Sequence, residues 1–185
     1  MRVIAGTAKG RPLAPVPGDS TRPITDRVKS ALFSILSSAG LIEGCRYLDL
    51  FGGTGAVGIE ALSRGAAEAV FCERDRVALR TLQNNLATTG FSNRGRVMPG
   101  DAFAYLERAD AEFDVIYIAP PQYRGIWLRA LRAVDARSEL LREGGRVIVQ
   151  VFPKEWTEPD LARLALLDRR QYGSTALFFF GKRGD

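Results

Sequence analysis

The stretch YLDLFGGTGAVGIEALSRG, residues 47–65, decides how this sequence folds. It passes from an apolar strand, 47–51, through a glycine-rich turn into a helix that begins at Ala56. Glycines in such a turn let the backbone approach a bound ligand closely. Glu73 ends the next predicted strand, about 20 residues after Gly53, where nucleotide-binding folds place an acid on the ribose. The pattern predicts a nucleoside-containing ligand beside the turn; a plain tight turn with a surface acid is the alternative.

Strands and helices alternate along most of the chain. Helices are predicted over 25–38, 56–65, 76–89, 101–109 and, in two adjoining pieces, 126–134 and 139–145. Strands are predicted over 47–51, 69–73, 96–101, 114–121, 146–152, 164–173 and 174–181. Such alternation predicts an α/β fold with a largely parallel sheet covered by helices on both faces. The closing pair of strands meets at Gly173 with no helix between them, which makes the last strand antiparallel.

Asp49 distinguishes between two kinds of nucleotide cofactor. It lies four residues before Gly53, where a carboxylate would repel the pyrophosphate of a dinucleotide but attract the ammonium and sulfonium groups of S-adenosylmethionine. Asp101 follows the third strand and can accept a hydrogen bond from an adenine amino group, although it can equally cap the next helix. The sequence therefore favours S-adenosylmethionine over a nicotinamide dinucleotide. The predicted cofactor-binding residues are Asp49, Gly53, Thr54, Gly55, Glu73, Asp101 and Ala102.

The composition excludes several kinds of chemistry. The 185 residues include no histidine and two separated cysteines, Cys45 and Cys72. This rules out Ser-His-Asp and Cys-His catalysis and disfavours a disulfide framework, and we expect no metal site. No apolar run reaches the roughly 20 residues of a membrane-spanning helix, and the first residues lack a signal-peptide stretch. We expect a cytoplasmic protein without membrane contact.

Positive charge gathers near the beginning of the chain. The net charge is +5, and most of this excess falls within residues 1–30. A positive end on a nearly neutral body is typical of proteins that bind a phosphate backbone. We expect residues 1–23 to form a basic arm or hairpin ahead of a domain over 24–185. The predicted RNA-binding residues are Arg2, Lys9, Arg11, Arg22 and Arg27, with Lys29 beside them.

Five segments of the chain resemble one family of class I methyltransferases. That family methylates the exocyclic N2 amine of a guanine in bacterial small-subunit ribosomal RNA. The segments are RVIAGTAKGRPL (2–13), RPITDRVKSALFSIL (22–36), YLDLFGGTGAVGIEALSRGA (47–66), FCERDRVALRTLQNNL (71–86) and RVMPGDAF (96–103). The resemblance implies a Rossmann-like, seven-stranded sheet whose last strand is antiparallel. It also implies that Arg22 and Thr25 lie near the cofactor, and that the partner is small-subunit ribosomal RNA or the assembling subunit. We expect a monomer.

The sequence departs from the family at the catalytic loop. The family motif after the fourth strand is Asp-Pro-Pro-aromatic, whereas this chain reads Ala119-Pro120-Pro121-Gln122-Tyr123. The resemblance implies that a side-chain oxygen and the following proline carbonyl hold the target amine while the aromatic ring stacks on the flipped base. Ala119 has no such oxygen. The candidate catalytic residues are the Pro120 carbonyl, the Gln122 amide oxygen and the Tyr123 ring.

This departure leaves several functions open. The chain can be an active variant of the family, or a methyltransferase that acts on another nucleic-acid or protein amine. It can also be an RNA-binding assembly factor that has lost catalysis. A nicotinamide-dependent dehydrogenase is a further alternative, which Asp49 disfavours.

Overall fold

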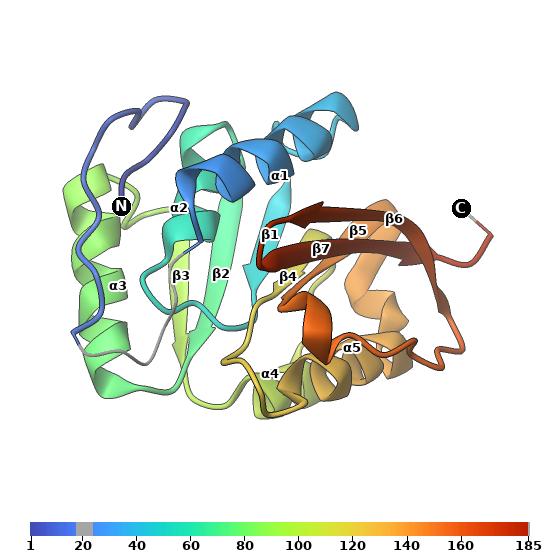
Figure 1. Ribbon diagram of the computed structural model, residues 1–185. Coiled ribbons are helices and arrows are strands. Elements are labelled where there is room, and N and C mark those ends of the chain that lie inside the picture. Colours follow the sequence, from blue (N-terminus) through green and yellow to red (C-terminus); the bar gives the residue numbers. More distant parts are fainter. Residues whose placement is uncertain (18–23, 185) are drawn as a thin grey trace.

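The computed structural model describes residues 1–17 and 24–184, which form a three-layer α/β structure (Figure 1). Its helices are α1 (Asp26–Ser38), α2 (Ala56–Ser63), α3 (Arg76–Thr89), α4 (Ala102–Arg108) and α5 (Ile126–Ala136), with 3₁₀ turns η1 (Ser138–Leu140) and η2 (Pro153–Glu155). Its strands are β1 (Arg46–Asp49), β2 (Glu68–Glu73), β3 (Gly95–Pro99), β4 (Phe113–Ile118), β5 (Leu141–Val151), β6 (Leu164–Tyr172) and β7 (Thr175–Lys182).

The strands form one sheet in the order β3-β2-β1-β4-β5-β7-β6. The pairs from β3 to β5 are parallel, and β7 runs antiparallel to both of its neighbours. The seven strands and the antiparallel last strand confirm the predicted fold class. From β1 the chain order of the strands proceeds outward in one direction, and from β4 it proceeds in the other. This switch creates a crevice between the carboxyl ends of β1 and β4, which is where open α/β sheets bind ligands.

Alternating side chains build a core on each face of the sheet. Tyr47 packs into the core beneath α1, α2 and α3, whereas Leu48 packs into the core beneath α4 and α5. The same alternation places Tyr117 on the first face and Ile116 on the second. This period of two is what a strand buried on both faces requires, and Figure 1 shows the two groups of helices on opposite sides of the sheet.

The prediction of a helix over 139–145 is wrong. A 3₁₀ turn covers Ser138–Leu140, and β5 begins at Leu141, which pairs with Phe113. Glycine disfavours a helix interior by about 1 kcal/mol, and this segment contains two. At Gly145, a Cβ atom would lie 2.8 Å from the Asp114 carbonyl oxygen, so the close approach of the β4 backbone also requires a glycine there.

Residues 1–17 lie along α2 and α3 and contribute to the first core (Figure 1). The segment folds back on itself through a bridge between Arg2 and Pro12. Three residues of this segment are buried against the domain: Val3, Ala8 and Leu13. The division at residue 23 stays a prediction. Within the described ranges, the structure holds no helix with the length and hydropathy to cross a membrane.

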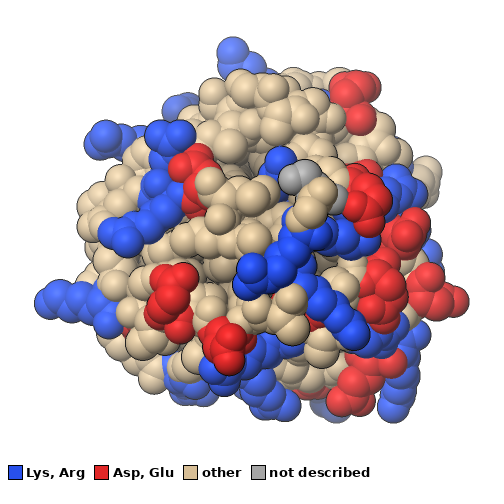
Figure 2. All heavy atoms as spheres, turned by 90° about the vertical axis from the view of Figure 1, so that its right-hand side faces the viewer, with Lys and Arg blue, Asp and Glu red and all other residues tan. Residues whose placement is uncertain are grey.

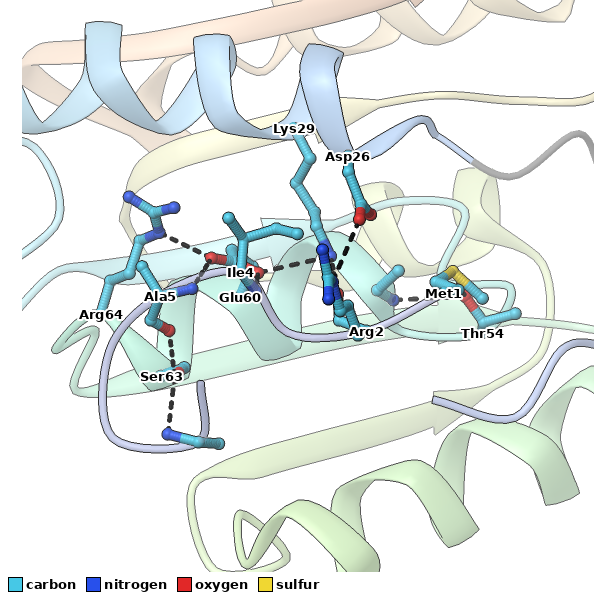
Figure 3. Close-up of polar contacts among 12 residues, drawn as sticks. Met1, Arg2, Ile4, Ala5, Asp26, Lys29, Thr54, Glu60, Ser63 and Arg64 are labelled. Carbon is cyan, nitrogen blue, oxygen red and sulfur yellow. Dashed lines mark hydrogen bonds and ion pairs between the residues drawn. The ribbon is translucent and has the colours of Figure 1, made fainter. Parts of the chain in front are cut away.

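Glu60 of α2 fixes this segment from inside the protein (Figure 3). The side chain is fully buried, and its carboxylate accepts hydrogen bonds from the N–H groups of Ile4 at 2.8 Å and Ala5 at 3.0 Å. It also pairs with Lys29 Nζ at 3.3 Å and Arg64 Nε at 2.8 Å. A buried carboxylate is stable when cations and N–H donors occupy both oxygens, so Glu60 joins the first residues to α1 and α2.

Candidate functional site

The glycine turn connects β1 to α2 at the carboxyl edge of the sheet. Gly55 adopts a φ of 78°, and a Cβ atom there would lie 2.3 Å from the side chain of Leu82. A Cβ atom at Gly58 would lie 2.2 Å from the Phe71 ring, because α2 packs tightly against β2. The turn therefore depends on glycine both for its backbone conformation and for close packing.

Glu73 is held against this turn by backbone N–H groups. Its Oε2 accepts from Gly53 N at 2.9 Å, and its Oε1 accepts from the N–H groups of Arg74 and Asp75, both at 2.8 Å. An ionised carboxylate can accept about four hydrogen bonds. The three backbone bonds fix its direction and leave acceptor capacity at the sheet edge for a ribose hydroxyl.

Asp49 is a buried acid at the centre of the crevice position. Its exposed fraction is 2%, and Oδ1 accepts from Phe51 N at 3.3 Å. Burial raises the pKa of Asp49 from 3.8 to about 7, and the Glu73 carboxylate acts in the same direction. None of the ion pairs among the described residues includes Asp49. A buried carboxylate without a cationic partner fits the ammonium and sulfonium of S-adenosylmethionine.

The remaining predicted cofactor residues also reach this edge. Asp101 caps α4, because its Oδ1 accepts from Phe103 N at 2.9 Å and Ala104 N at 3.2 Å. The alternative role left open by the sequence is therefore present, and Oδ2 takes no part in that cap. Ala102 is buried in the first turn of α4. Thr54 Oγ1 accepts from Ala56 N at 3.3 Å at the start of α2.

Asn85 of α3 links the glycine turn to the N-terminal segment. Its Nδ2 donates to the Thr54 carbonyl at 2.9 Å and to the Ala14 carbonyl at 3.0 Å, while its Oδ1 accepts from Ala14 N at 2.8 Å. Met1 lies beside the same turn (Figure 3), with Sδ 3.7 Å from Thr54 Oγ1. The segment expected to bind RNA thus adjoins the segment expected to bind the cofactor.

The loop after β4 presents an exposed aromatic ring. Tyr123 has a φ of 61°, which is unusual for a residue with a side chain, and its exposed fraction is 70%. Its ring centroid lies 5.7 Å from that of Phe152, with the planes tilted by 56°. Ala119 packs against the first core, and Pro120 and Gln122 are half-buried. The loop thus brings the three candidate catalytic residues together at the carboxyl edge.

Three polar residues near this loop were not predicted. Tyr117 Oη donates to Gln150 Oε1 at 2.5 Å, and both side chains lie on the sheet face that Ala119 shares. Burial raises the pKa of Tyr117 well above its ordinary range. Glu155 Oε2 accepts from Tyr123 N at 2.6 Å. A signal for Gln150 exists in the sequence, since it is the one polar residue within the otherwise apolar run 147–152. Glu155 follows that run without a distinguishing pattern.

The predicted RNA-binding residues differ in their surroundings. Lys9 and Arg27 are exposed, Arg2 pairs with Asp26 at 3.4 Å, and Arg11 donates to the Thr88 carbonyl at 2.5 Å. Arg22 lies outside the described residues.

Lys29 and Thr25 both have structural roles at the beginning of α1. Lys29 is fully buried on Glu60, so the expectation that it contacts RNA is wrong. A lysine can be buried here because α2 provides its counterion. Thr25 caps α1 by accepting from Val28 N at 3.3 Å; its predicted place near the cofactor stays a prediction.

The side of the molecule seen in Figure 2, which is the right-hand side of Figure 1, carries mixed charge. Acidic and basic side chains are interspersed there. A phosphate backbone binds to a surface dominated by positive charge, and the mixed charge of this side does not favour an RNA contact.

Fold and site together define a class I S-adenosylmethionine-dependent methyltransferase. The strand order creates a crevice at the carboxyl edge of the sheet. This edge bears the glycine turn, the buried acid and the proline loop. The family model described as Conserved hypothetical protein 95 matches residues 1–181, and the chain belongs to that family. The resemblance to small-subunit ribosomal RNA methyltransferases is thereby confirmed.

Individual relatives agree with this assignment. Ribosomal RNA small subunit methyltransferase D of Escherichia coli (strain K12) is 41% identical over 144 residues, which cover 77% of this chain and 71% of the relative. A solved Escherichia coli structure has a TM-score of 0.86 and 30% identity, covering 100% of this chain and 99% of that one. A Salinibacter ruber RNA methyltransferase solved with S-adenosyl-L-homocysteine has the same fold, with a TM-score of 0.66, 18% identity, and coverage of 89% and 95%.

Proposed function

We propose that this chain methylates the exocyclic N2 amine of a guanine in small-subunit ribosomal RNA. The observation that carries the proposal is the buried carboxylate of Asp49, which pairs with no cation among the described residues and lies at the sheet edge that also bears the exposed ring of Tyr123. The relative named as a small-subunit ribosomal RNA methyltransferase supports the substrate class. When bound, S-adenosylmethionine supplies the methyl group: its carbon–sulfur bond breaks as the amine nitrogen forms the new bond and then loses a proton to solvent.

The chain's own residues bind and orient the two reactants. Asp49 faces the positive charge of the cofactor, Glu73 binds its ribose, and Asp101 accepts from its adenine amino group. The Gly53–Gly55 backbone allows the close approach that this arrangement requires. No metal and no covalent enzyme intermediate are needed, because the methyl group passes directly between the reactants.

The loop at 119–123 holds the target base. The Pro120 carbonyl and the Gln122 amide oxygen accept from the exocyclic amine, in place of the acid that Ala119 lacks. Tyr123 stacks on the base after it leaves the RNA helix. Approach geometry then provides most of the rate acceleration, because orienting two reactants lowers the barrier without acid–base chemistry.

The RNA substrate is positioned by basic residues near the beginning of the chain. Arg2, Lys9, Arg11 and Arg27 contact phosphates, which fix the orientation of the nucleic acid without reading its bases. Arg22 belongs to the same proposed set. The substrate is ribosomal RNA itself or the assembling small subunit, and the enzyme acts as a monomer in the cytoplasm.

Transfer of labelled methyl from S-adenosylmethionine to small-subunit particles that lack the modification tests the proposal. We expect the label to be recovered as N2-methylguanosine after nucleoside analysis, and none to be transferred by Asp49→Ala. Label in another nucleoside or in protein would identify a different substrate. Binding of cofactor and RNA without transfer would favour an assembly factor, which the missing acid at Ala119 makes the second candidate.

A further inference from the structure

Glu155 contacts the backbone of the proposed catalytic loop from a distant part of the chain. It ends the η2 turn, Pro153–Glu155, which follows β5. Its Oε2 accepts from Tyr123 N at 2.6 Å across a sequence separation of 32 residues. Phe152, which precedes the turn, packs near Tyr123, with 5.7 Å between the two ring centroids. One short turn therefore contacts both the backbone and the side chain of Tyr123.

The turn is itself firmly anchored. The Trp156 ring stacks on Phe178 of β7 and on Trp127 of α5, with ring centroids 3.4 Å and 5.0 Å apart. Both partners are buried. Because β5 precedes the turn and this aromatic stack follows it, Glu155 has a defined position relative to the sheet.

Tyr123 needs such a contact to keep its conformation. Its φ of 61° is the one positive value for a residue other than glycine in the described part of the chain. That conformation is disfavoured when a Cβ atom is present, and it persists only where the surroundings hold it. The ring remains exposed and available for stacking while its backbone N–H is fixed.

The Glu155 carboxylate differs from a purely structural one in this protein. Asp135 uses both of its oxygens: Oδ1 accepts from Arg163 N and Leu164 N, both within 3 Å, and Oδ2 accepts from Ala162 N at 2.9 Å. In Glu155, Oε1 is buried and has no hydrogen-bond partner among the described residues. An unsatisfied buried oxygen destabilises the fold and in native proteins is often tied to function.

We propose that Glu155 is a positioning residue that holds Tyr123 in the conformation from which its ring stacks on the target base. This inference rests on the proposed function and adds a specific support for its aromatic residue. The aromatic stands one position later than in the family motif, and in this chain it presents its ring from a left-handed backbone conformation. Glu155 stabilises that conformation through the Tyr123 N–H group.

Three variants test this role: Glu155→Ala, Glu155→Gln and the control Glu158→Ala, which removes an exposed carboxylate three residues away. In Glu155→Ala we expect kcat for small-subunit particles to fall about tenfold, the scale of losing one charged hydrogen bond. The Tyr123 amide should exchange its hydrogen at least about tenfold faster. Cofactor affinity should stay within about twofold, because the hydrogen bond of Glu155 goes to Tyr123 and not to a proposed cofactor-binding residue. Glu155→Gln keeps an acceptor oxygen and should restore most of both properties, and Glu158→Ala should match the wild type.

Three results would overturn the inference. One is unchanged Tyr123 exchange in Glu155→Ala, and another is a Glu155→Gln variant as impaired as Glu155→Ala. The third is a loss of kcat accompanied by an equal loss of cofactor affinity and a matching fall in Tm, which would indicate a general structural role. The exchange measurement needs no methyl transfer. A wild-type chain that transfers no methyl would therefore refute the proposed function, while exchange at Tyr123 would still decide the role of Glu155.

Discussion

Cofactor binding should depend on pH through Asp49. Burial raises the pKa of this carboxyl group to about 7, well above its ordinary value of 3.8. The positively charged cofactor prefers the ionised form, and the ionised fraction falls tenfold for each pH unit below the pKa. We therefore expect the Kd for S-adenosylmethionine to rise about tenfold, or about 1.4 kcal/mol, per unit as the pH falls from 7 toward 5.

The same group should lower the stability of the cofactor-free protein at high pH. Because the folded pKa lies above the unfolded one, the stability that Asp49 contributes is complete below pH 3.8 and is lost as the pH rises through about 7. The difference between the two values corresponds to about 4 kcal/mol as an upper limit. Asp49→Asn removes this titration, and it should unfold at a higher urea concentration than the wild type at pH 8.

Calorimetric titration from pH 5.5 to 8.5, together with urea unfolding at each pH, measures both effects. Asp49→Asn should bind the cofactor weakly with little pH dependence, and Asp110→Asn, which changes an exposed acid, should behave like the wild type. A wild-type Kd that is constant across this range, or an Asp49→Asn variant less stable than the wild type at pH 8, would refute the reasoning.

Three further perturbations have defined outcomes. Glu60→Ala leaves Lys29 buried without its counterion and should lower the free energy of unfolding by about 3–5 kcal/mol in urea titration; a loss below 1 kcal/mol would contradict the buried pairing. Charge reversal at Lys9 and Arg11 should weaken RNA binding and flatten its salt dependence, and an unaltered slope would remove both from the interface. Tyr123→Ala should lower kcat about tenfold or more with cofactor Kd unchanged, and equal turnover would exclude base stacking.

The sequence predicted the features that depend on local pattern. The glycine turn at 52–55 and the alternation of strands and helices predicted the carboxyl-edge site and the sheet. The sequence-based prediction of a helix over 139–145 is wrong. Leu140 and Leu141 are instead buried in the 3₁₀ turn and at the start of β5. Here tertiary packing and two glycines outweigh a weak local preference.

Long-range contacts explain the remaining misses. Lys29 looked like a surface cation because its partner, Glu60, stands on a helix that comes later in the chain. Glu155 reaches Tyr123 because β4 and β5 are neighbours in the sheet, and Gln150 meets Tyr117 for the same reason. Such pairs depend on strand order and register, which no local pattern in a single sequence specifies.

The place of β7 has a consequence for how the protein is made. This strand lies between β5 and β6, although it is the last of the three in sequence, and β6 pairs with β7 alone among the described strands. During translation, β6 therefore leaves the ribosome before any strand exists to receive it. Closure of the sheet must wait for Thr175–Lys182, so a chain truncated after Tyr172 would lose two strands rather than one.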